Sequence, residues 1–304
     1  MFFDNKHEDE NQVHELVHLY VDGAFKRREL FSRLTKTLGS SAAATAALSS
    51  YSQLMAQAPS ACPADLRVPL DAPDIVARDV EFNGEASKIF AHFAYPRNLE
   101  GKAPGVIVIH ENRGLVEHHK DVCRRIARAG FVAIAPDLLS RQGGVQQFPE
   151  AQQQTAAYGR TTPEGRRADL ISALDYLKFT PFVQHDRIGL VGFCAGGANV
   201  WDMVINFPEF AAAVPYYGAP AATEMIANIQ TPMLLIYAET DRALTARIAP
   251  AMTEMLARQK RFGVRVYEGV GHAFNNDTGN AFNATAACEA WKETIIFFNK
   301  WLRR

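Results

Sequence analysis

The sequence has no apolar run close to the roughly 18 residues that a membrane-spanning helix requires. It also lacks an excess of one charge sign, because 32 lysines and arginines are matched by 33 aspartates and glutamates. This balance gives no reason to expect nucleic acid or an anionic membrane as a partner. With 304 residues, of which 48% are hydrophobic, the chain can bury a sizeable core, and we expect a soluble globular protein.

Cysteine is scarce, with four residues at Cys62, Cys123, Cys194 and Cys288. They have neither the density of a disulfide scaffold nor the C-x-x-C spacing of a zinc site, so we interpret each one separately. His110 and the pair His118-His119 have no carboxylate or thiol at a convincing ligand spacing, and the pair opens a helix that we predict to be polar. We therefore expect neither a metal ion nor another cofactor.

Residues 1–57 differ in character from the rest of the chain. Arg27 and Arg28 precede an Ala/Ser-rich stretch, which resembles a twin-arginine export signal and would imply a periplasmic protein. The segment before them is long and partly acidic, and many serines and threonines interrupt the apolar stretch. We favour a helical extension of a cytoplasmic protein, with amphipathic helices at about 12–20 and 26–54 that can join copies into a homo-oligomer. Residues 58–73 carry four prolines and are predicted to form a linker to a body at 74–304.

The body begins with two alternating runs, IVARDVEF and SKIFAHFAYP, around Asn83-Gly84. Asn-Gly tolerates the positive φ angles of a tight turn, so this pattern predicts a β-hairpin. Six short apolar runs follow, beginning near residues 105, 131, 187, 211, 232 and 264. Strands that are buried on both faces have this composition, and helical patterns separate most of the runs. The fold class we predict is α/β, with a mostly parallel sheet flanked by helices.

The sequence Gly192-Phe193-Cys194-Ala195-Gly196 lies between one of these strands and a helix, which is the context of a nucleophile elbow. A reacting side chain on such a sharp turn needs small residues two positions away on either side, because larger ones would collide with the strand and helix. The turn also sets the sulfur above a helix N-terminus, which is expected to lower the thiol pKa. A buried structural cysteine is the plainer interpretation of the same residues.

An elbow nucleophile requires an acid and a histidine later in the chain, in that order. Asp241 ends the run PMLLIYAETD, and His272 follows the next strand in VRVYEGVGHAF. Each alone could be a cap or a loop residue. Together they predict a Cys194-His272-Asp241 catalytic triad at the carboxyl edge of the sheet.

Four stretches, HENRG from His110, GFCAGG from Gly192, AETD from Ala238 and GVGHAF from Gly269, resemble the dienelactone hydrolase family of α/β hydrolases. The resemblance implies that Cys194 is the nucleophile, His272 the proton carrier and Asp241 the residue that orients the imidazole. It also implies that Glu111 pairs with the resting thiol and moves away when substrate binds. The oxyanion hole is expected from the backbone N–H groups of Ala195 and Asn112.

The sequence departs from the family at substrate recognition. An arginine four residues after the histidine holds the substrate carboxylate in family members that act on dienelactone, and this chain has Asn276 there. Tyr158 and Arg160 are weaker candidates for substrate binding, since they lie in a segment expected to overhang the site.

These features together predict a hydrolase of a small carboxylic ester or lactone that works through an acyl-cysteine. One alternative is a broader carboxylesterase or thioesterase, because a thiol nucleophile does not select its leaving group. Another is a catalytically silent α/β-hydrolase scaffold whose N-terminal helices make an assembly contact.

Overall fold

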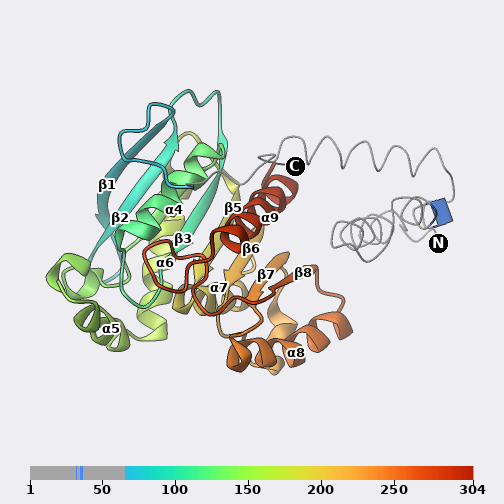
Figure 1. The fold of residues 1–304 in the computed structure, drawn as a ribbon. Coiled ribbons are helices and arrows are strands. Elements are labelled where there is room, and N and C mark those ends of the chain that lie inside the picture. The colour runs from blue at the N-terminus through green and yellow to red at the C-terminus, as the bar shows by residue number, and fades with distance from the viewer. Residues whose placement is uncertain (1–31, 33–34, 37–65, 304) are drawn as a thin grey trace. The chain divides into compact units, whose positions relative to one another are not determined.

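The computed structural model describes residues 32, 35–36 and 66–303 (Figure 1). The predicted helices at 12–20 and 26–54, the export signal and the oligomer contact lie largely or wholly outside these residues, as does half of the predicted linker. One unit of the chain, Cys62–Arg304, contains every element from β1 onward. Within the described residues, no helix combines the length and apolarity needed to cross a membrane.

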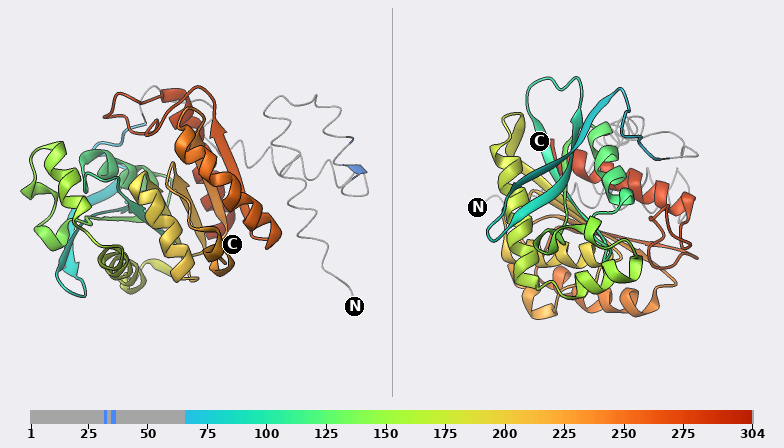
Figure 2. Two further views of the ribbon diagram at one scale, coloured as in Figure 1. Left: turned by 90° about the horizontal axis from the view of Figure 1, so that it is seen from below. Right: turned by 90° about the vertical axis from the view of Figure 1, so that its left-hand side faces the viewer.

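The strands of this unit form one sheet in the order β1-β2-β4-β3-β5-β6-β7-β8. Their bounds are β1 (Ile75–Asn83), β2 (Lys88–Pro96), β3 (Ala103–Ile109), β4 (Val132–Pro136), β5 (Val183–Phe193), β6 (Ala212–Tyr216), β7 (Met233–Ala238) and β8 (Phe262–Tyr267). Strand β2 pairs antiparallel with β1 and β4, and every later pairing is parallel. The sheet therefore runs from the hairpin at one edge to β8 at the other (Figure 2).

Helices cover both faces of the sheet, as the alternation of apolar runs and helical patterns predicts. Their bounds are α4 (Glu117–Arg128), α5 (Ala151–Gly159), α6 (Pro163–Phe179), α7 (Ala195–Asn206), α8 (Arg242–Ala257) and α9 (Ala284–Leu302). Buried residues of α4 and α9 join one hydrophobic core, and those of α6, α7 and α8 join a second core on the opposite face (Figure 1). Parallel strands with covered faces bring all their carboxyl ends to one edge, where a site can form.

The predicted strands are confirmed, with corrections at their ends. The predicted hairpin is confirmed, but its strands are joined by the four residues 84–87, in which Gly84 N donates to Ser87 O at 2.8 Å. The prediction of a tight turn at Asn83-Gly84 is therefore wrong. Helix α8, which we predict from the sequence to begin at Ala246, begins at Arg242. Helix α5 was not predicted, because it buries only Ala157 and so lacks an apolar stripe.

The helix predicted at the His118-His119 pair is confirmed as α4, and its composition is polar, but most of it is buried. Helix α4 buries nine of its 12 residues, including both histidines, between the sheet and the loop that follows β8. The expectation that each cysteine stands alone is wrong for Cys288, which is disulfide-bonded. Cys123 and Cys194 are free thiols. Among the described residues, no group of three or more His, Cys, Asp or Glu is arranged to hold a metal ion.

Candidate active site

Cys194 lies at a strained turn between β5 and α7. Its φ of 54° and ψ of −114° are rare for a residue with a side chain. A Cβ at Gly196 would lie 2.2 Å from the carbonyl oxygen of Ile109, and one at Gly192 would lie 2.3 Å from the carbonyl oxygen of Gly196. Only glycine fits at either place, as the elbow pattern predicts, so the turn presents the sulfur at the carboxyl edge of the sheet.

The structure brings together the three side chains predicted to meet there. Sγ of Cys194 lies 3.0 Å from Nε2 of His272, and Nδ1 of His272 lies 2.6 Å from Oδ2 of Asp241. The aspartate follows β7, where it starts α8, and the histidine follows β8. The His272 side chain is 39% exposed to solvent, and the Asp241 side chain is 14% exposed. The imidazole is therefore held from one side by a carboxylate and faces the sulfur with its other nitrogen.

Cys194 is a protonated thiol at neutral pH. Burial and the negative charge of Glu111 raise its pKa to about 11, and a hydrogen bond from the Ala195 backbone N–H offsets only part of this shift. The expectation of a lowered thiol pKa is therefore wrong, because burial and the carboxylate outweigh the helix N-terminus. A protonated sulfur donates to Nε2 of His272, so the single N–H of the neutral ring is on Nδ1 and donates to Asp241.

Glu111 is 8% exposed and is held by its surroundings. Its Oε2 accepts a hydrogen bond from Nδ2 of Asn276 at 2.8 Å, and its backbone N–H donates to Nε2 of His119 at 3.2 Å. Nε2 of His110 accepts from Leu138 N at 2.9 Å, so Nδ1 carries the proton and donates to the Glu111 carbonyl at 2.6 Å. The glutamate is thus fixed through both its backbone and one carboxylate oxygen.

One of the two residues predicted for the oxyanion hole lies at the start of a helix, and the other lies in a loop. Ala195 is the first residue of α7, directly after Cys194. Asn112 is half-buried and follows Glu111 in the loop between β3 and α4. Their role in binding an oxyanion stays a prediction.

Tyr158 and Arg160, at the end of α5, both have partners within the protein. The Tyr158 hydroxyl accepts from Nδ2 of Asn199 at 2.9 Å. Arg160 is exposed, donates to Oε1 of Gln142 at 3.1 Å and lies 5.9 Å from the centre of the Phe148 ring. Their contact with a substrate stays a prediction.

Two residues at the site carried no clear signal in the sequence. Tyr217 follows β6 with a φ of 36°, is fully buried, and its ring centre lies 5.1 Å from that of His272. Asn276 was interpreted only as the absence of an arginine, yet it bonds to Glu111. The spacing of four residues after His272 drew attention to Asn276. The sequence could not reveal its contact with Glu111, because Glu111 lies 165 residues earlier in the chain.

Comparison with known proteins shows the family to which the chain is related. The model of the "Dienelactone hydrolase family" matches residues 89–302. A protein of Methylorubrum extorquens named "Putative carboxymethylenebutenolidase" is 30% identical over an alignment of 250 residues that covers 78% of this chain and 86% of that protein. A crystal structure titled "Putative Dienelactone Hydrolase", from Klebsiella pneumoniae, superposes with a TM-score of 0.70 at 25% identity, covering 75% of this chain and 99% of that one. A dienelactone hydrolase-like promiscuous phosphotriesterase from metagenomic libraries superposes with a TM-score of 0.67 at 25% identity and the same coverage.

Proposed function

Because the chain belongs to the dienelactone hydrolase family, we propose that it cleaves a small carboxylic ester or lactone through Cys194, His272 and Asp241. Membership makes it a hydrolase with the α/β-hydrolase fold. The proposal adds the residues, the acyl-cysteine intermediate and the substrate class. One observation carries it: the unbroken chain of contacts from Cys194 Sγ through the His272 ring to Asp241.

The first half of the reaction transfers the acyl group to sulfur. As the thiol attacks the carbonyl carbon, its proton passes to Nε2 of His272, and Asp241 stabilises the imidazolium through Nδ1. The carbonyl oxygen takes up the negative charge and accepts from the N–H groups of Ala195 and Asn112. The carbon–oxygen bond to the leaving group then breaks, and His272 returns its proton to the alkoxide. In a lactone, the alcohol stays attached to the acyl group.

The second half hydrolyses the acyl-cysteine. His272 removes a proton from water, and the hydroxide attacks the thioester carbonyl in the same oxyanion site. Collapse of this adduct releases the carboxylic acid, and the sulfur recovers its proton from the imidazolium. The enzyme then returns to the neutral thiol of the resting state.

The substrate we favour carries no carboxylate near the reacting carbonyl. Asn276 stands where the family resemblance leads one to look for a carboxylate-binding arginine, and its amide is bonded to Glu111. A neutral amide lacks the paired charge-assisted hydrogen bonds of a guanidinium, and Glu111 would repel an anion. Neutral aryl esters and unsubstituted five-membered lactones fit this site better than dienelactone.

A substrate panel tests the proposal. The purified chain and its Cys194→Ala variant are assayed with aryl esters, thioesters, five-membered lactones with and without a carboxylate, and a phosphotriester. The phosphotriester is included because of the phosphotriesterase among the structural neighbours. We expect hydrolysis of neutral esters or lactones that the variant loses.

The other outcomes separate the alternatives. Comparable rates on thioesters and aryl esters would favour the broader carboxylesterase or thioesterase. Absence of hydrolysis across the panel, with every other property unchanged in the variant, would favour the silent scaffold. Full activity of Cys194→Ala would contradict the cysteine mechanism.

A further inference from the structure

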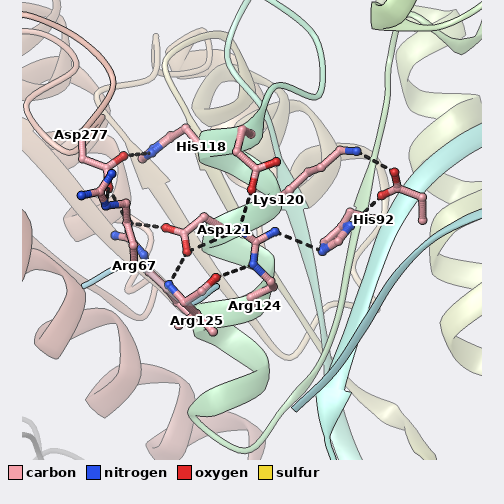
Figure 3. Close-up of polar contacts among 11 residues, drawn as sticks. Arg67, His92, His118, Lys120, Asp121, Arg124, Arg125 and Asp277 are labelled. Atoms are coloured by element: carbon pink, nitrogen blue, oxygen red, sulfur yellow. Dashed lines mark hydrogen bonds and ion pairs between the residues drawn. The ribbon is translucent and has the colours of Figure 1, made fainter. Parts of the chain in front are cut away.

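A group of ionisable side chains joins helix α4 to the loop that carries His272. We call it the α4 cluster; it comprises His118, Asp121, Arg124, Arg125 and Asp277 (Figure 3). The four residues from α4 are each at most 4% exposed, and the Asp277 side chain is 11% exposed. None of them belongs to the mechanism above. A buried group of charges is costly unless its members pair, so its arrangement calls for an explanation.

Asp277 ties the loop that carries His272 to helix α4. Its Oδ1 lies 2.8 Å from Nδ1 of His118, and its Oδ2 accepts from Nη2 of Arg125 at 2.8 Å. Burial alone would raise the pKa of Asp277, but the hydrogen bond from His118 and the charges of His118 and Arg125 lower it to about 2. The carboxylate is therefore ionised at neutral pH, and the loop is fixed five residues beyond His272.

Asn276, directly before this anchor, presents its amide to Glu111. Its Oδ1 accepts from the backbone N–H of Thr278 at 3.0 Å and from the Thr278 hydroxyl at 2.7 Å. These bonds fix which end of the amide is oxygen, so Nδ2 must face Oε2 of Glu111. The other carboxylate oxygen, Oε1, has no hydrogen-bond partner among the described residues. Asn276 is thus the side chain that holds the carboxylate.

We propose that Asn276 is a positioning residue that sets how reactive Cys194 is before substrate binds, and that Asp277, through His118 and Arg125, holds Asn276 in place. The proposal concerns the same site as the proposed function and rests on it. The amide acts through Glu111: it keeps a negative charge beside the sulfur, and that charge keeps the sulfur protonated.

Loss of this amide leaves a buried carboxylate without its hydrogen-bond donor. Such a group either takes up a proton or turns toward water. Both responses move negative charge away from the sulfur of Cys194, and the thiol then ionises at lower pH. A role confined to packing would lower stability and leave this ionisation unchanged.

The neighbouring Asn275 offers a matched control. It is the same residue type, it is 1% exposed against 5% for Asn276, and neither polar atom of its side chain has a partner among the described residues. The rate at which iodoacetamide alkylates Cys194 is measured across pH for the native chain, Asn276→Ala and Asn275→Ala. Mass spectrometry assigns the adduct, and Cys194→Ala gives the background.

We expect the pH midpoint for alkylation to fall by about one unit in Asn276→Ala, with about tenfold faster alkylation at neutral pH. Asn275→Ala should keep the native midpoint. In the double variant Glu111→Gln/Asn276→Ala, the midpoint should equal that of Glu111→Gln alone, because the amide acts only through the carboxylate. An unchanged midpoint in Asn276→Ala, or an equal shift in Asn275→Ala, would overturn the proposal.

A second variant keeps the test decisive if Asn276→Ala does not fold. Asp277→Asn weakens the anchor while leaving Asn276 in the chain, and we expect its midpoint to move in the same direction by a smaller amount. No movement would refute the role of the anchor. Alkylation requires no substrate, so this result stands apart from the hydrolysis panel: if Cys194→Ala still hydrolyses esters, the proposed function fails whatever the midpoints show.

Discussion

Two His-Asp pairs lie near each other in this protein, and they differ in what surrounds them. In the first pair, Nδ1 of His272 is 2.6 Å from Asp241; in the second, Nδ1 of His118 is 2.8 Å from Asp277. The His272 side chain is 39% exposed and its second nitrogen faces a thiol. The His118 side chain is fully buried, and its second nitrogen has no partner among the described residues.

The comparison shows that a His-Asp pair is not by itself a catalytic feature. In the proposed mechanism, Nε2 of the pair at the sheet edge moves a proton between the sulfur and a substrate. The histidine of the pair on α4 is closed off from solvent, and Arg125 supplies a cation to the carboxylate. We therefore propose a catalytic role for the first pair and a positioning role for the second.

The largest expected effect separates the two histidines by activity. His272→Ala should lower kcat/KM about 10²–10⁴-fold, because it removes the general base, with little change in thermal stability. His118→Ala should instead lower the free energy of unfolding by on the order of 2 kcal/mol. The loss is smaller than for an isolated buried ion pair, because Arg125 still pairs with Asp277 in the variant. Steady-state kinetics and thermal unfolding measure both. Equal losses of activity in the folded variants would break the comparison.

The second prediction uses pH to identify the anchoring carboxylate. The pKa of Asp277 is lowered to about 2, so its pairing stabilises the native state above the ordinary aspartate range and is lost as pH falls through about 2. Asp277→Asn should cost about 1 to 2 kcal/mol at neutral pH, after allowance for its partial exposure. The free energy of unfolding of the native chain and of Asp277→Asn is measured from pH 7 to pH 2, and the two values should become equal only near pH 2. A constant difference would mean that Asp277 is not ionised in its pairs.

The third prediction concerns the charge that connects the two regions. Glu111→Gln removes the negative charge beside Cys194, so the pH midpoint of alkylation should fall from about 11 by roughly one unit. This shift sets the upper limit for Asn276→Ala. A midpoint that stays at the native value would mean that burial alone keeps the thiol protonated.

The smallest expected effect is at the exposed side of the site. Arg160→Ala should leave kcat/KM for a neutral ester within about twofold of the native value, since its bond to Gln142 is at the surface. A loss confined to anionic substrates would instead identify Arg160 as a substrate-binding residue.

The sequence allowed the sheet and the three meeting side chains to be predicted because each depends on local order. Buried parallel strands have a composition that is visible in short runs, and residues at their carboxyl ends converge at one edge. Cys194, Asp241 and His272 each follow such a run. The need for glycine at positions 192 and 196 could be predicted from backbone crowding at the turn. In the structure, a Cβ at either position would collide with a backbone carbonyl oxygen.

The α4 cluster could not be predicted because its contacts depend on distant parts of the chain. His118 and Asp277 are 159 residues apart, and a helix with this many charged residues resembles a solvated surface helix in sequence. The thiol pKa had the wrong predicted direction for a related reason. The sequence shows a helix N-terminus beside Cys194, and the family resemblance indicates Glu111 as a neighbour of the thiol. The burial of the sulfur, which is the largest cause of the raised pKa, arises only from the packed fold.

The most direct test of the account is whether the acyl group of a substrate becomes attached to Cys194. The native chain is mixed with a reactive aryl ester, quenched in acid at short times and analysed by intact mass and peptide mapping. We predict a transient mass increase equal to the acyl group, located on the peptide that contains Cys194 and absent from Cys194→Ala. Turnover without this adduct, together with hydrolysis by Cys194→Ala, would contradict it.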